Sequence, residues 1–526
     1  MYFLRSKNIT VFAFCCLIVF HYITLLEYPI PTCDESFYGI SAIKYYSSVT
    51  NLGTWNGLSE SFYMFHGRLY WFLIGLLFSL VDVSLFAARL LSFVGLILLM
   101  LATFLIGCSY DKFKTGLWSS LLLGVSYLVM YSSHLVRPDI LAAAIGALLV
   151  WWMKYTLDNP HWIRFLILGI FLTLQLEIHV INLHLILPIL SILYVSSRKQ
   201  GFPNSLSLNL GVVCGMILGI LIVLFFRFGN YGGLIAFFSD LNLSLFFEFV
   251  TGSQFVSTEN IVADNFGFVR FAKFWWNSYG WTPPFVALLQ ALLFVFALIR
   301  ICISGSSDLR RLFGLVVLSS LTFIILNNNH AWLGYSVLWL PYYFVLVVAS
   351  VGELDVLGKI KVLGISGHDI LLVILFSIYV IGDVYLLSGN NFNLSQTYLS
   401  EGKAIVADIP SNSRVLAKQY WWYAIHNDIV YLDEHLIAYE GSLPWWVGVP
   451  EKKLDKNMVT NDGMQIYRQF DELQVDYVVT DGVLGCSDIP NVHYKRFEAV
   501  LESKCELIDS IDSSLYNTQR LYKCSM

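Results

Sequence analysis

Two adjacent carboxylates, Asp34 and Glu35, lie in the stretch PTCDESFYGI, directly after the first long apolar segment of the chain. A carboxylate at the edge of a membrane is partly desolvated, and burial brings its proton affinity toward that of a general base. The sequence therefore presents both acids as candidate catalytic residues. Because any loop that leaves a membrane is polar, the pair acquires meaning only from its companions.

Two further segments carry groups that could complete such a site. YMFHGRLYWF contains His66 and Arg68 before an aromatic stretch, and SSHLVRPDILAAA contains Arg137 and Asp139 around a proline. The planar guanidinium of arginine matches the oxygen atoms of a phosphate in a two-pronged contact. Acids, a histidine and guanidinium groups on one side of a membrane indicate a reaction on a lipid phosphate.

Two other polar segments are possible substrate contacts. LEIHVINLHL places His179 between two apolar segments, and NNNHAWLGY contains His330 and Tyr335. A polar turn that satisfies its own backbone is an equally good interpretation of the first segment. The aromatic stretch FVRFAKFWWNSYGW carries two basic residues, a composition typical of an anchor at the membrane interface.

The composition indicates a polytopic membrane protein. The chain has 526 residues, of which 57% are hydrophobic and 13% charged, and its mean hydropathy is +0.66. Soluble proteins carry roughly 25% charged residues. The net charge of −5 offers no basic surface for nucleic acid. We expect the cysteines of the apolar segments, Cys15, Cys16, Cys108, Cys214 and Cys302, to be small core residues.

Eleven apolar segments have the length that crosses a bilayer as a helix, about 17 to 25 residues. They lie near 9–28, 86–107, 115–133, 140–157, 162–178, 183–196, 208–227, 284–303, 311–327, 335–351 and 369–388. The basic N-terminus is followed by no small-residue cleavage site, so the first segment is predicted to be an uncleaved span. The stretch 69–81 is predicted to be a short helix at the outer membrane surface.

Lys and Arg set the orientation, because cytoplasmic loops retain positive charge. With the N-terminus inside, Arg137 is the one basic residue in the short outer loops. Counting 69–81 as a span would place Lys112 and Lys114 outside. We expect a membrane domain over 1–389 with outer loops 29–85 and 228–283, in a bacterial inner membrane with its active site extracytoplasmic.

The remaining residues, 390–526, change in composition and are predicted to form a small extracytoplasmic α/β domain. RVLA, DIVYLD and VDYVVTD are typical of short buried strands. Cys486, Cys505 and Cys524 lie where an oxidising compartment permits a disulfide. Cys505 and Cys524 flank a predicted hairpin, which favours that pair. No CxxC motif occurs, so no structural zinc site is expected.

In order and sidedness these motifs resemble the GT-C glycosyltransferases that use polyprenyl-phosphate sugars. The shared features are an acidic pair after the first span, a His before an aromatic surface helix, the span ARLLSFVGLILLMLATFLIG, and RPD before the fourth span. The pattern is similar to that of the dolichyl-phosphate-mannose protein mannosyltransferases and the bacterial lipid A aminoarabinose transferases. It covers roughly residues 8–345.

The resemblance implies a role for each matching residue. Asp34 matches the general base, and Glu35 its acidic neighbour, which positions the acceptor or a basic side chain. His66 matches a residue that faces the donor phosphate, and Arg137 and Asp139 match a motif near that phosphate. This sequence has HGR where the family has HPP or KPP, so Arg68 could share the role of His66.

The implied reaction is an inverting sugar transfer from a polyprenyl-phosphate donor to a lipid, glycan or protein acceptor. No cofactor is expected, and a divalent metal held by the acids stays open. A transporter or lipid flippase is the alternative from another class, although such proteins favour ionisable groups near the bilayer midplane and repeated halves. An oligosaccharide ligase or polymerase with a diphosphate-linked donor is a third possibility.

Overall fold

The computed structural model describes ten segments of the chain. They are residues 2–51, 68–198, 202–228, 284–304, 306–326, 333–362, 365–388, 394–433, 473–481 and 491–525. The structural statements below concern these segments.

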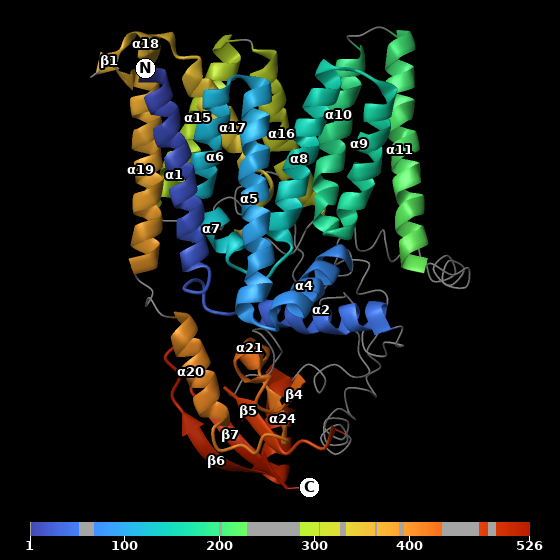
Figure 1. Ribbon diagram of the computed structural model, residues 1–526, viewed down its shortest axis with the longest axis vertical. Helices are drawn as coiled ribbons and strands as arrows, with labels where there is room; N and C mark the ends of the chain where they lie inside the picture. The colour runs from blue at the N-terminus through green and yellow to red at the C-terminus, as the bar shows by residue number, and fades with distance from the viewer. Residues whose placement is uncertain are drawn as a thin grey trace.

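The first part of the chain is a bundle of long helices (Figure 1). Its helices are α1 (Tyr2–Thr24), α2 (Cys33–Asn51), α4 (Arg68–Val81), α5 (Leu85–Tyr110), α6 (Phe113–Gly124), α7 (Tyr127–Ser133), α8 (Asp139–Asp158), α9 (Trp162–Leu174), η1 (Gln175–Glu177), η2 (Val180–Leu185), α10 (Ile186–Arg198), α11 (Phe202–Phe228), α15 (Pro284–Ser304), α16 (Ser307–Leu326), η4 (Leu333–Leu338), α17 (Leu340–Gly352), α18 (Asp355–Lys359) and α19 (Gly367–Ser388). The strands β1 (Lys361–Val362) and β2 (Ile365–Ser366) form a small antiparallel pair.

Several of these helices have the length and composition of membrane spans. Within the described segments, four helices are long and apolar enough to cross a membrane, or five if the bent pair of α6 and α7 is one span. The four are α5, α8 and the apolar parts of α15 and α19. Each of the eleven predicted segments contains helix. That all eleven cross the membrane stays a prediction.

The predicted span 115–133 is not one straight helix. It is divided into α6 and α7, whose axes differ by 67°. Ser126 has an extended backbone between the two helices, and the imidazole of His21 donates a 2.8 Å hydrogen bond to the carbonyl of Gly124. Inside a bilayer a broken helix needs such partners for its released backbone groups. The bend directs the following residues, 134–139, toward one end of the bundle.

Two helices lie across that end of the bundle, between the long helices and the C-terminal part of the chain (Figure 1). One is α4, which corresponds to the short helix predicted at 69–81. The other is α2, which packs along α4 and was not expected from the sequence. The described part of the predicted outer loop 29–85 is therefore mainly helical, and its two helices, α2 and α4, pack against each other.

The C-terminal residues form a five-stranded sheet with helices. The elements are α20 (Leu394–Val406), β3 (Arg414–Ala417), η5 (Gln419–Trp421), α21 (Trp422–Ile425), β4 (Val430–Asp433), β5 (Tyr477–Thr480), α24 (Asn491–Lys504), β6 (Cys505–Ile511) and β7 (Gln519–Cys524). The strand order is β4-β3-β5-β7-β6, with β3 parallel to β4 and β5, and β7 antiparallel to β5 and β6.

Three predicted strands and one predicted disulfide are present in this sheet. RVLA, DIVYLD and VDYVVTD contain β3, β4 and β5. Cys505 and Cys524 face each other across the β6–β7 hairpin and are joined by a disulfide, as the sequence favoured. Cys486 lies outside the described residues.

The expectation that the five other cysteines are core residues was wrong for four of them. Cys15, Cys16, Cys214 and Cys302 are exposed on the outer surfaces of their helices, and Cys108 is half-buried. An apolar position in a membrane helix faces either protein or lipid, and hydrophobicity alone does not distinguish the two.

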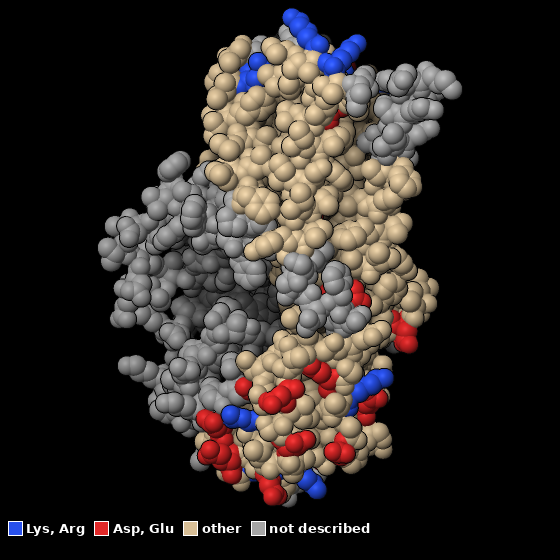
Figure 2. All heavy atoms as spheres, turned by 90° about the vertical axis from the view of Figure 1, so that its left-hand side faces the viewer, with Lys and Arg blue, Asp and Glu red and all other residues tan. Residues whose placement is uncertain are grey.

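Charge is segregated along the molecule. On the face shown in Figure 2, blue Lys and Arg atoms gather at the end of the bundle opposite the C-terminal sheet, with a mostly uncharged band between. Lys112, Lys114, Lys359 and Lys361 are exposed. With the N-terminus inside and eleven spans counted, the segments between the second and third spans and between the tenth and eleventh spans, which carry these lysines, lie on the inner side.

A close contact between α9 and α11 gives a test of the packing. A Cβ atom on Gly215 would lie 2.9 Å from the carbonyl carbon of Leu166 and 3.1 Å from the Cα of Gly169. Small residues allow such helix backbones to approach. We expect Gly215→Val to destabilise the protein by about 1–3 kcal/mol, as overpacking does, measured by thermal unfolding in detergent.

Gly314→Val is the matched control, because no atom lies within 4 Å of a Cβ atom built on Gly314 in α16. Equal melting temperatures for the two variants would contradict the close approach of α9 and α11.

Candidate active site

A buried ion pair joins the acidic turn to the bundle. Arg89 of α5 donates from Nε to Oε1 of Glu35 at 2.9 Å and from Nη2 to Oε2 at 3.0 Å, and both side chains are fully buried. The backbone N–H of Val136 donates to Oε1 and that of Thr32 to Oε2, each at 3.0 Å. Each carboxylate oxygen of Glu35 thus accepts two hydrogen bonds.

The same guanidinium also holds the chain that leads into the turn. Arg89 donates from Nη1 to the carbonyl of Leu25 at 3.0 Å and from Nη2 to the carbonyl of Pro29 at 2.9 Å. Residues 25–35 are therefore fixed around one side chain. The backbone of Asp34 lies inside this arrangement, and its side chain lies outside the described part of the structure.

Local sequence explains why Glu35 points this way. Thr32 precedes α2, and TCDE has the pattern of a capping box, in which the acid at the third helical position reaches back to the N–H of the capping residue. The bond from the Thr32 N–H to Glu35 is this contact. Glu35 thus begins α2 and neutralises Arg89 with one carboxylate.

Arg137 and Asp139 form a second pair close by. Arg137 donates from Nε to Oδ2 of Asp139 at 2.8 Å and from Nη2 to the hydroxyl of Tyr335 at 3.3 Å. Its guanidinium also lies 5.8 Å from the centroid of the Tyr335 ring. Arg137 is 9% exposed and Asp139 is fully buried, so the guanidinium is held in one orientation.

The segment 134–139 is anchored to the acidic turn. The N–H of Val136 binds Glu35, and the hydroxyl of Ser92 in α5 donates to the carbonyl of Leu135 at 2.5 Å. Arg137 follows directly after Val136. The structure therefore brings the turn that carries Asp34 and the segment that carries Arg137 to the same end of the bundle.

His179 lies in the short segment between η1 and η2 and is buried. Burial and the positive charge of Arg137 lower its pKa to about 3. The imidazole is therefore neutral at physiological pH and offers a hydrogen-bonding group rather than a charge. Tyr70 of α4 is also buried here, and burial raises the pKa of its phenol well above the usual value.

The structure thus places five predicted residues at this end of the bundle: Glu35, Arg137, Asp139, His179 and Tyr335. Asp34 and Arg68 are described for their backbones alone, and His66 and His330 lie outside the described residues. Arg89 and Tyr70 were missed by the sequence analysis. A single arginine within the apolar helix 85–110 was the available signal, because such a charge needs a buried partner.

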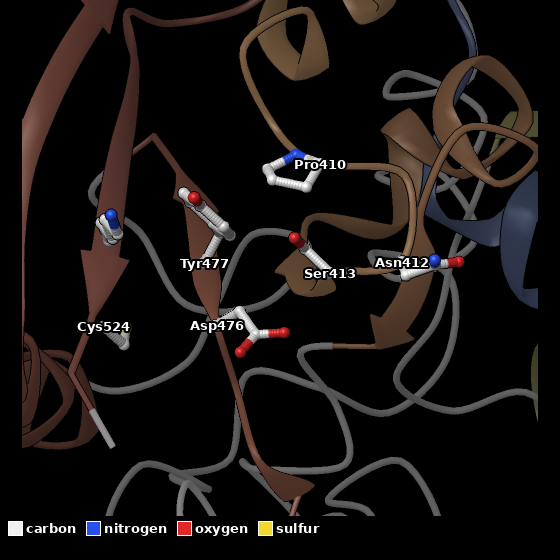
Figure 3. A pocket seen from close by; sticks show the side chains of 7 residues that line it. Pro410, Asn412, Ser413, Asp476, Tyr477 and Cys524 are labelled. Atoms are coloured by element: carbon white, nitrogen blue, oxygen red, sulfur yellow. The ribbon is translucent and has the colours of Figure 1, made fainter.

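No group of metal ligands marks this site in the described part of the structure. Among the described side chains, no three His, Cys, Asp or Glu residues converge as metal ligands. A cleft of about 310 Å³ lies in the C-terminal sheet instead, at the amino end of β5 (Figure 3). It is lined by Pro410, Asn412, Ser413, Asp476, Tyr477, Lys523 and Cys524.

No family model and no curated protein sequence matches this chain. Its fold does match solved structures. ArnT from Cupriavidus metallidurans bound to undecaprenyl phosphate superimposes with a TM-score of 0.62 at 11% identity, over 98% of each chain. The apo form of that protein gives 0.61.

The oligosaccharyltransferase AglB from Archaeoglobus fulgidus, in complex with an inhibitory peptide and a dolichol-phosphate, gives a TM-score of 0.50 at 11% identity. That match covers 93% of this chain and 72% of AglB. The resemblance to the GT-C glycosyltransferases that the sequence predicted is confirmed at the level of the fold.

The buried pair gives a prediction for stability. Glu35→Gln leaves Arg89 without its counter-charge, and removing one partner of a buried ion pair costs about 3–5 kcal/mol. We expect a loss of that size in the free energy of unfolding, measured in mixed detergent micelles.

The control is Asp308→Asn, which breaks the partly exposed pair between Asp308 and Arg311 and should cost at most about 1 kcal/mol. A loss for Glu35→Gln no larger than that of the control would show that the pair does not anchor the turn.

Proposed function

We propose that the protein is a membrane glycosyltransferase that moves one sugar from a polyprenyl-phosphate donor to an acceptor on the extracytoplasmic side. The observation that carries the proposal is the meeting of the acidic turn, fixed by Arg89 and Glu35, with Arg137 and Asp139. They meet at one end of a bundle whose fold matches that of ArnT over nearly its full length.

In the proposed reaction Asp34 is the general base. Its carboxylate takes the proton of an acceptor hydroxyl while that oxygen attacks the anomeric carbon of the sugar. The bond between this carbon and the phosphate oxygen breaks, and polyprenyl phosphate leaves with the bonding electron pair. Attack from the face opposite the leaving group inverts the anomeric centre.

Arg137 is the proposed partner of the leaving phosphate. Negative charge develops there as the bond breaks, and a guanidinium that is already oriented stabilises it without further reorganisation. Asp139 and Tyr335 hold Arg137 in place. We assign Arg68 and His66 to the same phosphate by their position in the sequence, and neutral His179 to a hydrogen bond with the substrate.

The molecules bound in the matching structures support the proposed classes of donor and acceptor. One ArnT structure contains undecaprenyl phosphate, and an AglB structure contains dolichol-phosphate and a peptide. We propose a polyprenyl-phosphate sugar as donor here and a lipid, glycan or protein as acceptor.

The proposed orientation follows from charge. The exposed Lys112, Lys114, Lys359 and Lys361 adjoin or belong to α6, α18 and β1, at the end of the bundle opposite the C-terminal sheet (Figure 1). Since cytoplasmic loops retain Lys and Arg, the site and the sheet would face the extracytoplasmic side, in the inner membrane if the protein is bacterial.

Asp34→Asn tests the base. Removing a general base slows a reaction by about 10²–10⁴-fold, so we expect a drop of that size in kcat at unchanged folded yield. The assay follows transfer of label from a panel of undecaprenyl-phosphate sugars to a membrane extract.

The matched control is Asp82→Asn. Asp82 is an exposed acid between α4 and α5, with a positive φ of 111° that asparagine also tolerates. This variant should retain full activity. Wild-type turnover by Asp34→Asn would refute the assignment of the base.

Arg137→Ala tests the phosphate contact. A hydrogen bond to a charged group contributes about 1.5–3 kcal/mol, so we expect donor affinity to fall roughly 10- to 100-fold. Binding of undecaprenyl phosphate to the purified protein measures this directly. Unchanged affinity would remove Arg137 from the donor site.

A further inference from the structure

Two tyrosines of the C-terminal part of the chain bind the acidic turn. Tyr516 donates from its hydroxyl to the carbonyl of Pro31 at 2.7 Å. Tyr423, in α21, donates to the carbonyl of Glu35 at 3.1 Å. The two accepting carbonyls lie on either side of Asp34 in the sequence. The turn is therefore held from the bundle by Arg89 and from the sheet by two phenols.

We propose that Tyr423 and Tyr516 are positioning residues, through which the C-terminal sheet sets the geometry of the turn that carries Asp34. The inference rests on the proposed function, because it gives these tyrosines a role in the transfer reaction. Their contacts are with backbone carbonyls, so they act through the turn and not on the substrate.

Packing makes both tyrosines rigid supports. The ring of Tyr516 stacks on that of Tyr420, with centroids 4.0 Å apart and planes inclined by 13°. Tyr423 is 5% exposed and packs with Trp422 against Gly39 of α2, where a Cβ atom would come within 2.6 Å of the Trp422 ring. A glycine at this position lets the aromatic side chains reach the turn.

Tyr516 is connected, through its stacking partner Tyr420, to the edge of the sheet at which the parallel strands β3 and β5 end. Tyr420 follows β3 closely and donates to Asp481, which follows β5, at 3.2 Å. Asp481 also pairs with buried Lys418 at 3.1 Å. This is the edge of an α/β sheet at which ligands usually bind. A change at that edge would therefore reach the turn through Tyr420 and Tyr516.

The hydroxyl groups of Tyr423 and Tyr516 stay protonated and can therefore donate hydrogen bonds. Burial raises the pKa of Tyr423 and that of Tyr516 well above the usual value, so neither ionises at physiological pH. Both hydroxyl groups therefore keep the proton that they donate to the two carbonyls.

The test uses Tyr423→Phe, Tyr516→Phe and the double variant of the full-length protein, which lose the hydroxyl groups and keep the rings. Tyr431→Phe is the matched control, because Tyr431 makes the same kind of bond to the carbonyl of Ala417, within the sheet. Amide hydrogen exchange of residues 32–36 reports on the turn, and kcat and donor affinity report on the reaction.

A hydrogen bond contributes a factor of about 3–10 in an equilibrium. We expect the double variant to exchange these amides at least about fivefold faster and to lose roughly 10- to 50-fold in kcat, with donor affinity unchanged. Tyr431→Phe should stay within about twofold of the wild type in both measurements. If the double variant is unstable, the single variants give the same comparison with smaller effects.

Two results would overturn the proposal: unchanged exchange of the turn in all variants, or faster exchange with unchanged kcat. The exchange measurement needs no substrate. If the wild-type protein transfers no sugar, the proposed function fails, while exchange still decides whether the tyrosines hold the turn.

Discussion

The pairing of Arg89 with Glu35 is the interaction on which the site depends. Two charges without contact to water are expensive unless each hydrogen-bonding position is filled. Here the carboxylate accepts four hydrogen bonds, and the guanidinium binds the carbonyls of residues 25 and 29 in addition. The requirement to satisfy one charged pair thus determines the course of the chain from the end of α1 to the start of α2.

Interruptions of regular structure gather at this end of the bundle. Regular α-helix is interrupted after α1, on both sides of the short helix α7, and between α9 and α10, where the chain forms the 3-10 helices η1 and η2. In a membrane such backbone is tolerated where protein groups satisfy it. His21 binds the carbonyl at the bend after Gly124, and Ser92 binds the carbonyl of Leu135. The irregular segments are stable because the helices around them supply polar side chains, and those segments carry the candidate site.

The sequence predicted the features that depend on local pattern. Apolar runs located the helices, alternation located β3, β4 and β5, and the hairpin located the disulfide. It did not reveal the bend at Ser126, because GVSYLVM is as apolar as a continuous span. The start of α2 was present in TCDE as a capping box and was missed. The partner of Glu35 was missed because Arg89 lies 54 residues away, and pairing over that distance is a property of the folded chain.

The structure also separates the two acids that the sequence presents together. The carboxylate of Glu35 is fully engaged, because each of its oxygens accepts one hydrogen bond from the buried Arg89 and one from a backbone N–H group. A base must approach its proton donor, and a carboxylate enclosed in this way does not. Asp34, at the second position of α2, lies where the helix dipole favours an anion. The neighbouring glutamate and the two tyrosines fix its backbone from opposite sides. In the proposed reaction Glu35 therefore fixes the position of the Asp34 backbone. It can do so because the two acids are adjacent in the sequence.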